Sequence, residues 1–484
     1  MTPTPSLRRS FSLFHGFVSG CLFCYLFFIS AVRSSHEAHH SHTIQVASLL
    51  PSDSCQASST EFERDSVLKV VHRYGPCAEK NSVADLSPEE FLLQDEARVT
   101  RMQRQVDVSE ITPASDTEGG LETSEAVLPA NYGISLGTGN YVVQVGLGTP
   151  ARRLSLVFDT GSGLTWTQCQ PCRRCYAQKD PLFNPSQSMS YSNVSCSSMP
   201  CGYLRAETGV GPSCSASGKA CVYAIAYGDN SYSVGYLASD KLTLGQSDVV
   251  GNFYFGCGQN NIGLYGRAAG LLGLANGPLS IVSQTASRFN KLFAYCIPSS
   301  SSNTGYLAFG KPGFASSPVQ YTPISSSSPT SLYGINIVGI SVGGDLLPIP
   351  LSAFRSSQTI IDSGTVISRL PPTVYNALRN AFREGMTQYP KAPALTILDT
   401  CFDLRSYSVV SIPTVAFTFQ GGATVKVAAK GILFSPRLSQ VCLAFASRHS
   451  TSEIAIIGNF QQKTLQVVHD VGNRRIGFAS GACS

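Results

Sequence analysis

Two copies of one short motif carry the residues of this sequence that are best suited to chemistry. Leu156-Val-Phe-Asp159-Thr160-Gly161-Ser162 recurs 203 residues later as Thr359-Ile-Ile-Asp362-Ser363-Gly364-Thr365. In each copy an apolar strand runs into an aspartate, a hydroxyl residue and a glycine that permits a tight turn. The neighbouring hydroxyl groups can donate hydrogen bonds that orient the carboxylate.

Two such carboxylates facing each other would form an acid–base pair. At close range both cannot ionise cheaply, so one pKa rises and the pair holds a single proton in acid. The ionised member could then take a proton from water while the protonated member polarises a carbonyl group. The motif therefore predicts hydrolysis by activated water at Asp159 and Asp362, without a covalent intermediate, a metal ion or another cofactor.

A second repeated feature indicates that the motif belongs to a duplicated unit. Ala269-Gly-Leu-Leu-Gly273-Leu274 follows the first copy and Ile454-Ala-Ile-Ile-Gly458-Asn459 follows the second, each an apolar run that ends in glycine. Two matched features in the same order are stronger than one short motif, because short motifs recur by accident. We expect two related lobes, residues 130–324 and 325–484.

The composition favours strands as the elements that position the motif. The chain has 484 residues with 43 Gly and 27 Pro, which suit turns and short strands better than long helices. Only 13% of the residues are charged, which excludes a disordered or coiled-coil protein. Alternating strand patterns occur at residues 141–147, 154–158 and 221–227, and a comparable series runs from 333 to 361. The fold class is predicted to be all-β.

The first 34 residues have the pattern of a secretory signal peptide. Arg8 and Arg9 precede an apolar stretch at residues 11–32, and Val32-Arg33-Ser34 offers a cleavage point. His15 and two glycines interrupt the stretch, and an uncleaved membrane anchor is the alternative interpretation.

The segment that follows, residues 35–129, is acidic and the rest of the chain is basic. The segment holds 7 Lys and Arg against 17 Asp and Glu, a net charge of −10, whereas residues 130–484 hold 25 against 13, a net charge of +12. Opposite charges favour docking of one part on the other. We call residues 35–129 the leader and expect it to be a propeptide that docks on the basic body and weakens its hold when acid protonates its carboxylates.

The leader contains one predicted helix and one predicted linker. In residues 86–98, Ser87 can cap a helix, Pro88 suits its first position and Glu90 completes a capping box. The polar run at 107–126 has no apolar period and predicts a linker. Before the helix, Lys69 or Arg73 is the residue expected to approach the two aspartates.

Cysteine usage fits an oxidising compartment. An even number, twelve, lies in the body and predicts six disulfides of open connectivity. Asn193-Val-Ser195 is a glycosylation sequon. The twelve are Cys169, Cys172, Cys175, Cys196, Cys201, Cys214, Cys221, Cys257, Cys296, Cys401, Cys442 and Cys483.

With these motifs assembled, the chain from about Ala130 resembles a pepsin-type aspartic protease of the plant nepenthesin-like branch. The resemblance implies a bilobal double β-barrel with a central cleft, preceded by a signal peptide and a propeptide. It implies that Asp159 and Asp362 are catalytic. The residues it assigns to supporting roles are Thr160 and Ser363, which brace the two loops, Ser162 and Thr365, which bond the carboxylates, Tyr227 and Gly228 of a flap hairpin, and Trp166, the partner of that tyrosine.

The resemblance also places the cysteines and exposes one departure. The cysteines between Trp166 and Tyr227 resemble the cysteine-rich insertion of this branch, and Cys401 with Cys442 resembles the bridge of its second lobe. The branch usually has aspartate where this chain has Gly163. We expect this change to alter loop flexibility or subsite electrostatics more than activity.

Other motifs match formally and are less well supported. His36-Glu37-Ala-His39-His40 fits a zinc-protease pattern but lies at the signal junction without a third ligand. Gly339-Ile-Ser341-Val-Gly343 fits a nucleophile elbow, although Gly344-Asp345 predicts a hairpin turn instead of the following helix. Cys169-x-x-Cys172-x-x-Cys175 could hold iron–sulfur or zinc, but a secreted chain favours disulfides.

The predicted activity is therefore acid endopeptidase action on proteins or peptides. A basic body could bind nucleic acid, but no recognised motif for this stands out, and no nucleic-acid partner is expected. A catalytically weak member that inhibits glycan hydrolases is the other alternative, and the retained aspartates argue against it. We expect a monomer in the extracellular space (the apoplast), with vacuole and plastid as alternatives, whose partners are its substrates and its own propeptide.

Overall fold

The computed structural model describes a defined set of residues. They are residues 40–50, 54–56, 66–73, 75–77, 87–111, 141–226, 231–245, 248–263, 267–310, 317–326, 331–356, 358–450, 452–481 and 483. The predicted signal peptide 1–34 lies outside this set, as do Tyr227 and Gly228.

One 15-stranded sheet connects the leader with both parts of the body. Its strands, in order across the sheet, are β14 (Gln320–Pro323), β30 (Arg475–Ser480), β29 (Leu465–Asp470), β12 (Leu292–Cys296), β13 (Thr304–Phe309), β2 (Val67–His72), β3 (Tyr141–Leu147), β4 (Arg152–Asp159), β11 (Gly270–Gly273), β5 (Trp166–Gln168), β10 (Asp248–Ile262), β9 (Tyr232–Leu244), β8 (Cys221–Ala226) and β7 (Ser213–Cys214), with β6 (Ser192–Asn193) paired to β9.

Four smaller sheets complete the described strands, and three of them lie wholly in the second half of the chain. Their strand orders are β15 (Gly334–Ile335), β18 (Thr359–Ile361), β28 (Ala455–Ile457), β19 (Ser368–Leu370) and β27 (Phe445–Ser447); then β17 (Asp345–Leu346), β16 (Ile337–Val342), β23 (Val415–Phe419) and β24 (Thr424–Lys426); then β20 (Lys391–Ala392), β21 (Cys401–Phe402), β26 (Gln440–Leu443) and β25 (Leu433–Arg437); and finally β1 (Ser41–Gln45) with β22 (Val409–Pro413).

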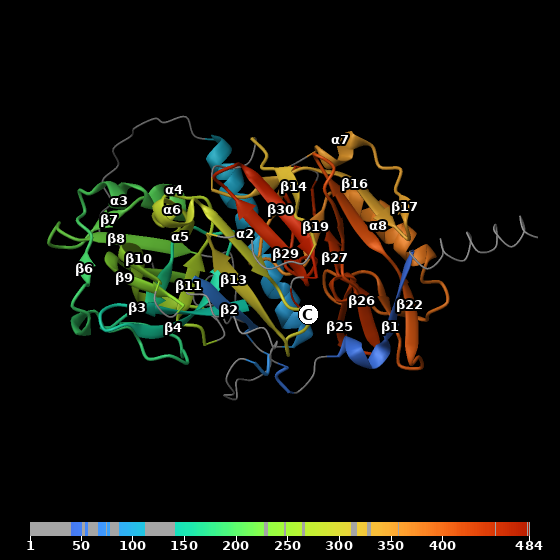
Figure 1. Cartoon of the computed structure of the whole chain (residues 1–484), viewed down its shortest axis with the longest axis horizontal. Helices are drawn as coiled ribbons and strands as arrows, with labels where there is room; N and C mark the ends of the chain where they lie inside the picture. Colours follow the sequence, from blue (N-terminus) through green and yellow to red (C-terminus); the bar gives the residue numbers. More distant parts are fainter. Residues whose placement is uncertain are drawn as a thin grey trace, which may run out of the picture.

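The two copies of the motif lie in matching strand arrangements. β4 pairs in parallel with β11, and β18 pairs in parallel with β28. A short strand after each motif, β5 or β19, lies antiparallel to β11 or β28. The all-β, bilobal fold expected from the repeated sequence is confirmed, and Figure 1 shows its two halves, one in green and yellow and the other in orange and red.

Helices are short in the body, with one exception. They are α3 (Met199–Gly202), α4 (Leu204–Thr208), α5 (Ile281–Gln284), α6 (Ala286–Phe289), α7 (Leu351–Phe354), α8 (Pro372–Glu384) and α9 (Ala429–Ile432), with 3-10 turns η1 (Val46–Leu49) in the leader and η2 (Pro185–Gln187). The exception, α8, begins with proline at its first position and buries Val374, Leu378 and Phe382 at helical spacing.

Three secondary-structure elements of the leader pack against the body. β1 pairs antiparallel with β22, and β2 lies between β13 and β3 of the large sheet. The third element is helix α2 (Pro88–Ile111), which runs between the two halves of the molecule (Figure 1).

Helix α2 begins where the sequence predicts, but it ends later than predicted. The Ser87 amide donates to Glu90 Oε2 at 2.9 Å, and the Glu90 amide donates to Ser87 Oγ at 3.1 Å, which is the predicted capping box. The helix continues to Ile111, and the predicted linker is therefore wrong for residues 107–111. Neither glycine nor proline occurs between Pro88 and Ile111 to interrupt the helix.

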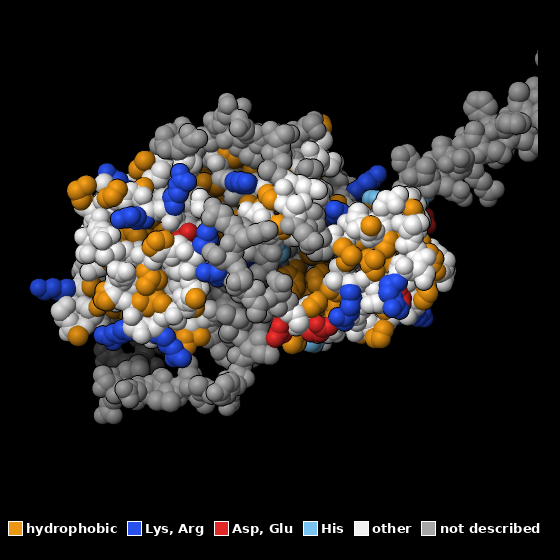
Figure 2. Space-filling model, turned by 90° about the horizontal axis from the view of Figure 1, so that it is seen from below, with side chains coloured by type: hydrophobic (Ala, Val, Ile, Leu, Met, Phe, Trp, Pro, Cys, Tyr) orange, Lys and Arg blue, Asp and Glu red, His pale blue; other side chains and the backbone are white. Residues whose placement is uncertain are grey.

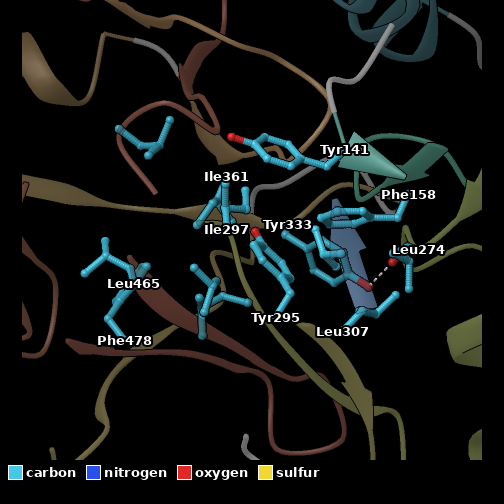
Figure 3. Packing of buried hydrophobic residues seen from close by; sticks show 14 of the residues in the cluster. Tyr141, Phe158, Leu274, Tyr295, Ile297, Leu307, Tyr333, Ile361, Leu465 and Phe478 are labelled. Atoms are coloured by element: carbon cyan, nitrogen blue, oxygen red, sulfur yellow. Dashed lines mark hydrogen bonds between the residues drawn. The ribbon is translucent and has the colours of Figure 1, made fainter. Parts of the chain in front are cut away.

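An aromatic core lies beneath the two motifs (Figure 3). Phe158, the residue before Asp159, packs against Tyr295 with ring centroids 5.6 Å apart. The Tyr333 hydroxyl donates to the Leu274 carbonyl at 2.7 Å, and the Tyr295 hydroxyl donates to Gln462. The Gln462 amide in turn donates to the backbone carbonyl of Asp362 at 3.2 Å. Residues from both lobes therefore meet in one rigid base under the motifs.

Disulfides join all twelve body cysteines and both leader cysteines of the described residues. The pairs are Cys169–Cys257, Cys172–Cys175, Cys196–Cys214, Cys201–Cys221, Cys296–Cys483 and Cys401–Cys442 in the body, and Cys55–Cys77 in the leader. Of the three cysteines that formally suggested a metal cluster, Cys172 and Cys175 are bonded to each other and Cys169 is bonded to Cys257. The pair implied for the second lobe is present.

The surface of the body carries its basic charge in a scattered form. Figure 2 shows Lys and Arg side chains spread over both halves, with Asp and Glu confined to a smaller area. In the part of the chain that the structure describes, no helix has the length and apolar character needed to cross a bilayer.

Candidate active site

The two aspartates of the repeated motif lie at equivalent strand ends and are fully buried. Asp159 is the last residue of β4, and Asp362 directly follows β18. Each has 0% exposure to solvent with the leader in place. The residue before each aspartate, Phe158 or Ile361, packs into the large apolar core. This packing holds both strand ends, and with them the carboxylates, inside the protein.

Matched hydrogen bonds hold the two carboxylates. Ser162 Oγ donates to Asp159 Oδ2 at 2.8 Å, and the Gly161 amide donates to Oδ1 at 2.9 Å. In the second lobe, Thr365 Oγ1 donates to Asp362 Oδ2 at 2.6 Å, and the Gly364 amide donates to Oδ1 at 3.0 Å. The hydroxyl roles that the resemblance implies for Ser162 and Thr365 therefore agree with the geometry.

The hydroxyl residues next to the aspartates tie one loop to the other. The Thr160 amide donates to Ser363 Oγ at 3.1 Å, and the Ser363 amide donates to Thr160 Oγ1 at 2.8 Å. Both residues are 1% exposed. This reciprocal pair is the cross-brace expected for Thr160 and Ser363, and it fixes the position of each carboxylate relative to the other lobe.

Glycine is required on both loops because the opposite carboxylate comes so close. A Cβ atom on Gly161 would lie 2.8 Å from Asp362 Oδ1, and one on Gly364 would lie 2.3 Å from Asp159 Oδ1. Any larger residue would push the two carboxylates apart.

An arginine of the leader lies between the two carboxylates. Arg98 Nη2 donates to Asp159 Oδ1 at 2.6 Å and to Asp362 Oδ2 at 3.0 Å. Its Nη1 donates to Asp159 Oδ2 at 3.1 Å, and its Nε donates to Asp362 Oδ2 at 3.2 Å. The guanidinium group thus fills the space between the two carboxylates.

The charge of Arg98 changes the protonation of the pair. Burial alone would raise the pKa of Asp362, but Arg98 and the hydrogen bonds from Thr365 and Gly364 bring it below its ordinary value. Burial likewise acts to lower the pKa of Arg98, and the two carboxylates outweigh it and raise that pKa. In the described state the Arg98 guanidinium is therefore the counter-charge of Asp362, and it bonds to both carboxylates.

Of the two leader residues expected to approach the aspartates, Lys69 does not, and the approach of Arg73, a buried residue that directly follows β2, stays a prediction. Lys69 is an exposed residue of β2 and lies opposite Tyr306 of β13. Arg98 takes that place because α2, and not β2, passes between the lobes. The signal in the sequence is its position on the helix: Leu92, Asp95, Val99 and Met102 are buried on the same side.

The same face of α2 packs on the second lobe. Leu92 joins the apolar cluster of Val366 and Leu395, while Val99 and Met102 pack with Ile360 and Ile454. These contacts position Arg98 between the aspartates and cover the site from solvent.

The other predicted site residues are placed only in part. Trp166 is fully buried in β5 and lies opposite Gly256 of β10 and Leu271 of β11. Its expected partner Tyr227 and the adjacent Gly228 lie outside the described residues, so the flap assignment stays a prediction. Asn193 is exposed on β6, where its Oδ1 accepts a hydrogen bond from the Tyr191 hydroxyl at 2.7 Å.

The competing motifs lie away from the aspartates. Ser341 belongs to β16, and Gly343 and Gly344 form the hairpin turn to β17 with φ angles of 59° and 87°. Of the zinc-protease pattern only His40 is described. Among the described residues no group of three His, Cys, Asp or Glu side chains is arranged to hold a metal ion.

Sequence reasoning missed Glu207, which fills the space beside Gly163. A Cβ atom on Gly163 would lie 1.8 Å from Glu207 Oε2, and one on Gly277 would lie 2.3 Å from Glu207 Oε1. Glu207 Oε1 accepts a hydrogen bond from the Leu279 amide at 2.7 Å, whereas Oε2 has no hydrogen-bond partner among the described residues. Burial raises the pKa of Glu207 to about 7. A carboxyl group from α4 therefore lies where the related branch carries aspartate on the catalytic loop.

Comparison with known proteins identifies relatives over most of the chain. Residues 141–311 match a family model described as the N-terminal part of a xylanase inhibitor, and residues 332–480 match the C-terminal part. An aspartyl protease family protein of Arabidopsis thaliana is 53% identical over 450 residues, covering 92% of this chain and 93% of that protein. Aspartic proteinase nepenthesin-2 of Nepenthes gracilis is 37% identical over 380 residues, covering 76% and 84%.

A solved structure shares the fold at low sequence identity. The basic 7S globulin from soybean superposes with a TM-score of 0.56 at 19% identity, covering 71% of this chain and 93% of that one. This likeness supports the bilobal fold alone.

The contact between Gly163 and Glu207 yields a stability prediction. Gly163→Asp should lower the melting temperature by several degrees, because the new side chain collides with a buried carboxyl group. Gly163→Asp combined with Glu207→Ala should recover most of that loss, because the space is then free. Thermal unfolding of the two single variants and the double variant measures the coupling. Additive effects of the two changes would contradict it.

Proposed function

The chain belongs to the plant aspartyl protease family and is an aspartic endopeptidase, and we propose that Asp159 and Asp362 are its catalytic pair. The observation that carries this assignment is the matched geometry: two buried carboxylates, each held by a hydroxyl and a glycine amide, meet on loops that brace each other. Arg98 bonds to both, so the two carboxylates lie within reach of one small group.

The reaction follows from the protonation of the pair once Arg98 has left. Without that positive charge, two buried carboxylates at close range hold one proton between them in acid. The ionised member takes a proton from a water molecule whose oxygen attacks the peptide carbonyl carbon, and the protonated member gives its proton to the carbonyl oxygen. The carboxyl group that took the proton of the water then gives it to the amide nitrogen, and the C–N bond breaks. One hydroxyl of the diol intermediate gives its proton to the other carboxylate as it becomes the new carboxyl carbonyl, so the pair is again singly protonated.

The supporting residues have separate tasks in this scheme. Ser162 and Thr365 orient the carboxylates through their hydroxyl groups, and Thr160 and Ser363 keep the two loops in register. Tyr227 and Gly228 would close over the substrate as a flap, with Trp166 beside it.

Acidic working conditions are supported by Glu207 as well as by the dyad. Because burial raises its pKa to about 7, Glu207 is protonated in acid and becomes charged as the pH rises through that value. A buried charge without a partner on Oε2 is unfavourable. The group therefore contributes stability that is present in acid and is lost as the pH rises towards neutrality and above.

The inhibitor alternative is less well supported than hydrolysis. The family models carry the name of a xylanase inhibitor, but the aspartates, their hydroxyl partners and both loop glycines are all present here. A protein that only blocked glycan hydrolases would not need this apparatus. Binding of DNA has no specific observation in its favour.

We further propose that residues 35–129 are a propeptide that keeps the enzyme inactive. Arg98 blocks the dyad, and acidic residues of α2 pair with basic residues of the body, as the opposite net charges predict. Glu89 Oε1 lies 3.1 Å from Arg437 Nη2, and Glu96 Oε1 lies 2.9 Å from His449 Nε2. Acid weakens the block at the dyad itself, because protonation of the aspartates removes the partners of Arg98.

A histidine of the leader adds to this response. Burial, Lys463 and Arg73 lower the pKa of His72 to about 3, so His72 is neutral while β2 is docked. A released β2 would have an ordinary histidine pKa near 6.5. Docking is therefore strongest above about pH 6.5 and weakens as the pH falls from there towards 3, because the released strand takes up the proton.

Secretion, glycosylation and the state of the processed enzyme complete the proposal. Residues 1–34 act as a signal peptide that directs the chain to secretion, with the apoplast as destination in preference to vacuole or plastid. The exposed Asn193 carries a glycan, and the processed enzyme is a monomer that acts on proteins and peptides without nucleic acid.

The catalytic pair is tested by Asp159→Asn. The processed variant should lose at least about 100-fold in kcat/KM on peptides, because it lacks one half of the acid–base pair. Circular dichroism and the melting temperature should show that it is folded. Asp403→Asn, at a surface site paired with Arg405, is the matched control and should retain activity. Full activity of Asp159→Asn would overturn the assignment.

The block at the dyad is tested by Arg98→Met in the full-length chain. Loss of the guanidinium leaves two buried carboxylates without a counter-charge, which weakens leader docking. The variant should lose its leader at least about 10-fold faster than the wild type at a fixed mildly acidic pH, measured by gel electrophoresis over time. Arg405→Met, whose side chain is 67% exposed, is the control and should match the wild type. Equal rates for Arg98→Met and the wild type would contradict the block.

The pH response of β2 is tested by His72→Gln in an Asp159→Asn background, which keeps the chain uncut. Hydrogen exchange of β2, corrected for the intrinsic pH dependence, reports when the strand opens. The midpoint of opening should move to lower pH in His72→Gln, because glutamine takes up no proton. Lys69→Gln, on the same strand but exposed, should leave the midpoint in place. An unchanged midpoint in His72→Gln would show that His72 has no part in the response.

A further inference from the structure

A buried arginine beside the dyad is held almost entirely by the leader. Arg369 of β19 is 1% exposed, and its Nε and Nη2 donate to Glu96 Oε2 at 3.1 and 2.9 Å. Its Nη2 also lies 3.1 Å from Asp95 Oδ2. Within the body, Arg369 donates from Nη1 to the Ile367 carbonyl at 2.7 Å.

Two backbone N–H groups complete the surroundings of Asp95. The Val366 amide donates to Asp95 Oδ1 at 2.5 Å, and the Ile367 amide donates to Asp95 Oδ2 at 3.0 Å. One carboxylate of the leader thus receives two amide hydrogen bonds and the charge of Arg369. Such a combination of amides and guanidinium is specific for a carboxylate group.

We call the Arg369 guanidinium and the amides of Val366 and Ile367 the cradle. The cradle directly adjoins the two aspartates. Val366 and Ile367 follow Thr365 in the chain, and Thr365 bonds Asp362. A ligand that reaches the cradle therefore lies along the same loop that carries one of the catalytic carboxylates.

Removal of the leader takes both carboxylates away from the cradle, and the Ile367 carbonyl stays as an acceptor for Arg369 Nη1. Asp95 and Glu96 leave together, and the amides of Val366 and Ile367 lose the acceptors they had. The nearby charged groups of the body are Arg448, His449 and Glu453, of which Glu453 accepts a hydrogen bond from the His449 amide at 3.0 Å. The Arg369 guanidinium is then a buried positive charge without a carboxylate partner, which is energetically unfavourable.

We propose that Arg369, with the amides of Val366 and Ile367, forms a subsite of the processed enzyme that binds an acidic side chain of the substrate. The leader occupies this subsite with Asp95 and Glu96 until it is removed. The inference rests on the proposed function and deepens it: the enzyme selects peptides with Asp or Glu at one position near the scissile bond.

The subsite has a consequence for pH dependence. Asp and Glu side chains of a free peptide ionise near pH 4. The preference for the acid over the corresponding amide should therefore grow between about pH 3 and pH 5. Arg369 and Arg448 stay charged throughout that range. The other charged groups described near Arg369 are His449 and Glu453, which bond to each other through the His449 amide.

The test compares matched peptides in the processed wild-type enzyme. Octapeptides carry Asp or Asn, and Glu or Gln, at each position in turn, and kcat/KM is measured at pH 3 and pH 5. At one position the acid should exceed the amide by about 10- to 100-fold at pH 5, and by much less at pH 3. Equal rates for acid and amide at every position would overturn the subsite.

Variants assign the preference to Arg369. Arg369→Met should reduce the ratio of acid to amide rates to about 1, and Arg369→Lys should retain part of it because the charge remains. Arg405→Met is the control and should keep the wild-type ratio. A wild-type ratio in a folded Arg369→Met enzyme would contradict the role of Arg369.

A binding measurement separates this proposal from the catalytic one. If no peptide is hydrolysed by the wild type, the catalytic assignment fails, and calorimetric binding of the same acid and amide peptides to the processed protein decides the subsite. Tighter binding of the acids would support it, and equal binding would overturn it. This comparison uses only the wild-type protein, so it does not depend on whether Arg369→Met folds.

Discussion

The structure depends on placing two carboxylates in one small buried space. Asp159 and Asp362 are both inaccessible to solvent, and each loop approaches the opposite carboxylate so closely that only glycine fits at Gly161 and Gly364. Two negative charges in such surroundings require a proton or a cation. In the described chain the cation is Arg98, and in the proposed scheme a shared proton takes its place after processing. That exchange would turn an inactive chain into an acid–base catalyst.

That requirement explains why the two lobes are so firmly joined. The reciprocal bonds of Thr160 and Ser363 set the loops against each other, and the aromatic core below holds both strand ends (Figure 3). Gln462 connects this core to the Asp362 backbone. The leader does not alter this frame. It adds strand β2 between β13 and β3 and helix α2 over the site, whereas the bonds of Thr160, Ser363 and Gln462 are made by residues of the body alone.

The features of the fold and of the site that the sequence predicts are those set by residues close together in the chain. The repeated Asp-(Thr/Ser)-Gly motif predicts the strand ends, the hydroxyl bonds and the two lobes, because each depends on neighbours in the chain. The capping box at Ser87 and Glu90 is likewise local. The role of Arg98 is not, because nothing near it in the sequence shows which residues α2 will face. The contact of Glu207 with Gly163 was not predicted for the same reason, because it arises only when α4 packs against the loop that follows Asp159.

The leader does not respond to acid as one unit, and its charged contacts explain why. At the dyad, docking lowers the pKa of Asp362, and at β2 docking lowers the pKa of His72, so acid weakens both contacts. At Asp95 the sign is opposite: burial raises its pKa above the ordinary value, although Arg369 and two amides act to lower it. Protonation of Asp95 therefore favours the docked state. The proposed subsite differs in this respect, because a substrate side chain has no Glu96 beside it and lies in a cleft that the leader no longer covers, so that Arg369 and the two amides favour its ionised form. The general expectation that acid loosens every carboxylate of the leader is too simple. In the proposed activation, acid would weaken the contacts at the dyad and at β2 but not the contact of Asp95 with Arg369, so cleavage of the leader would be needed to complete its release.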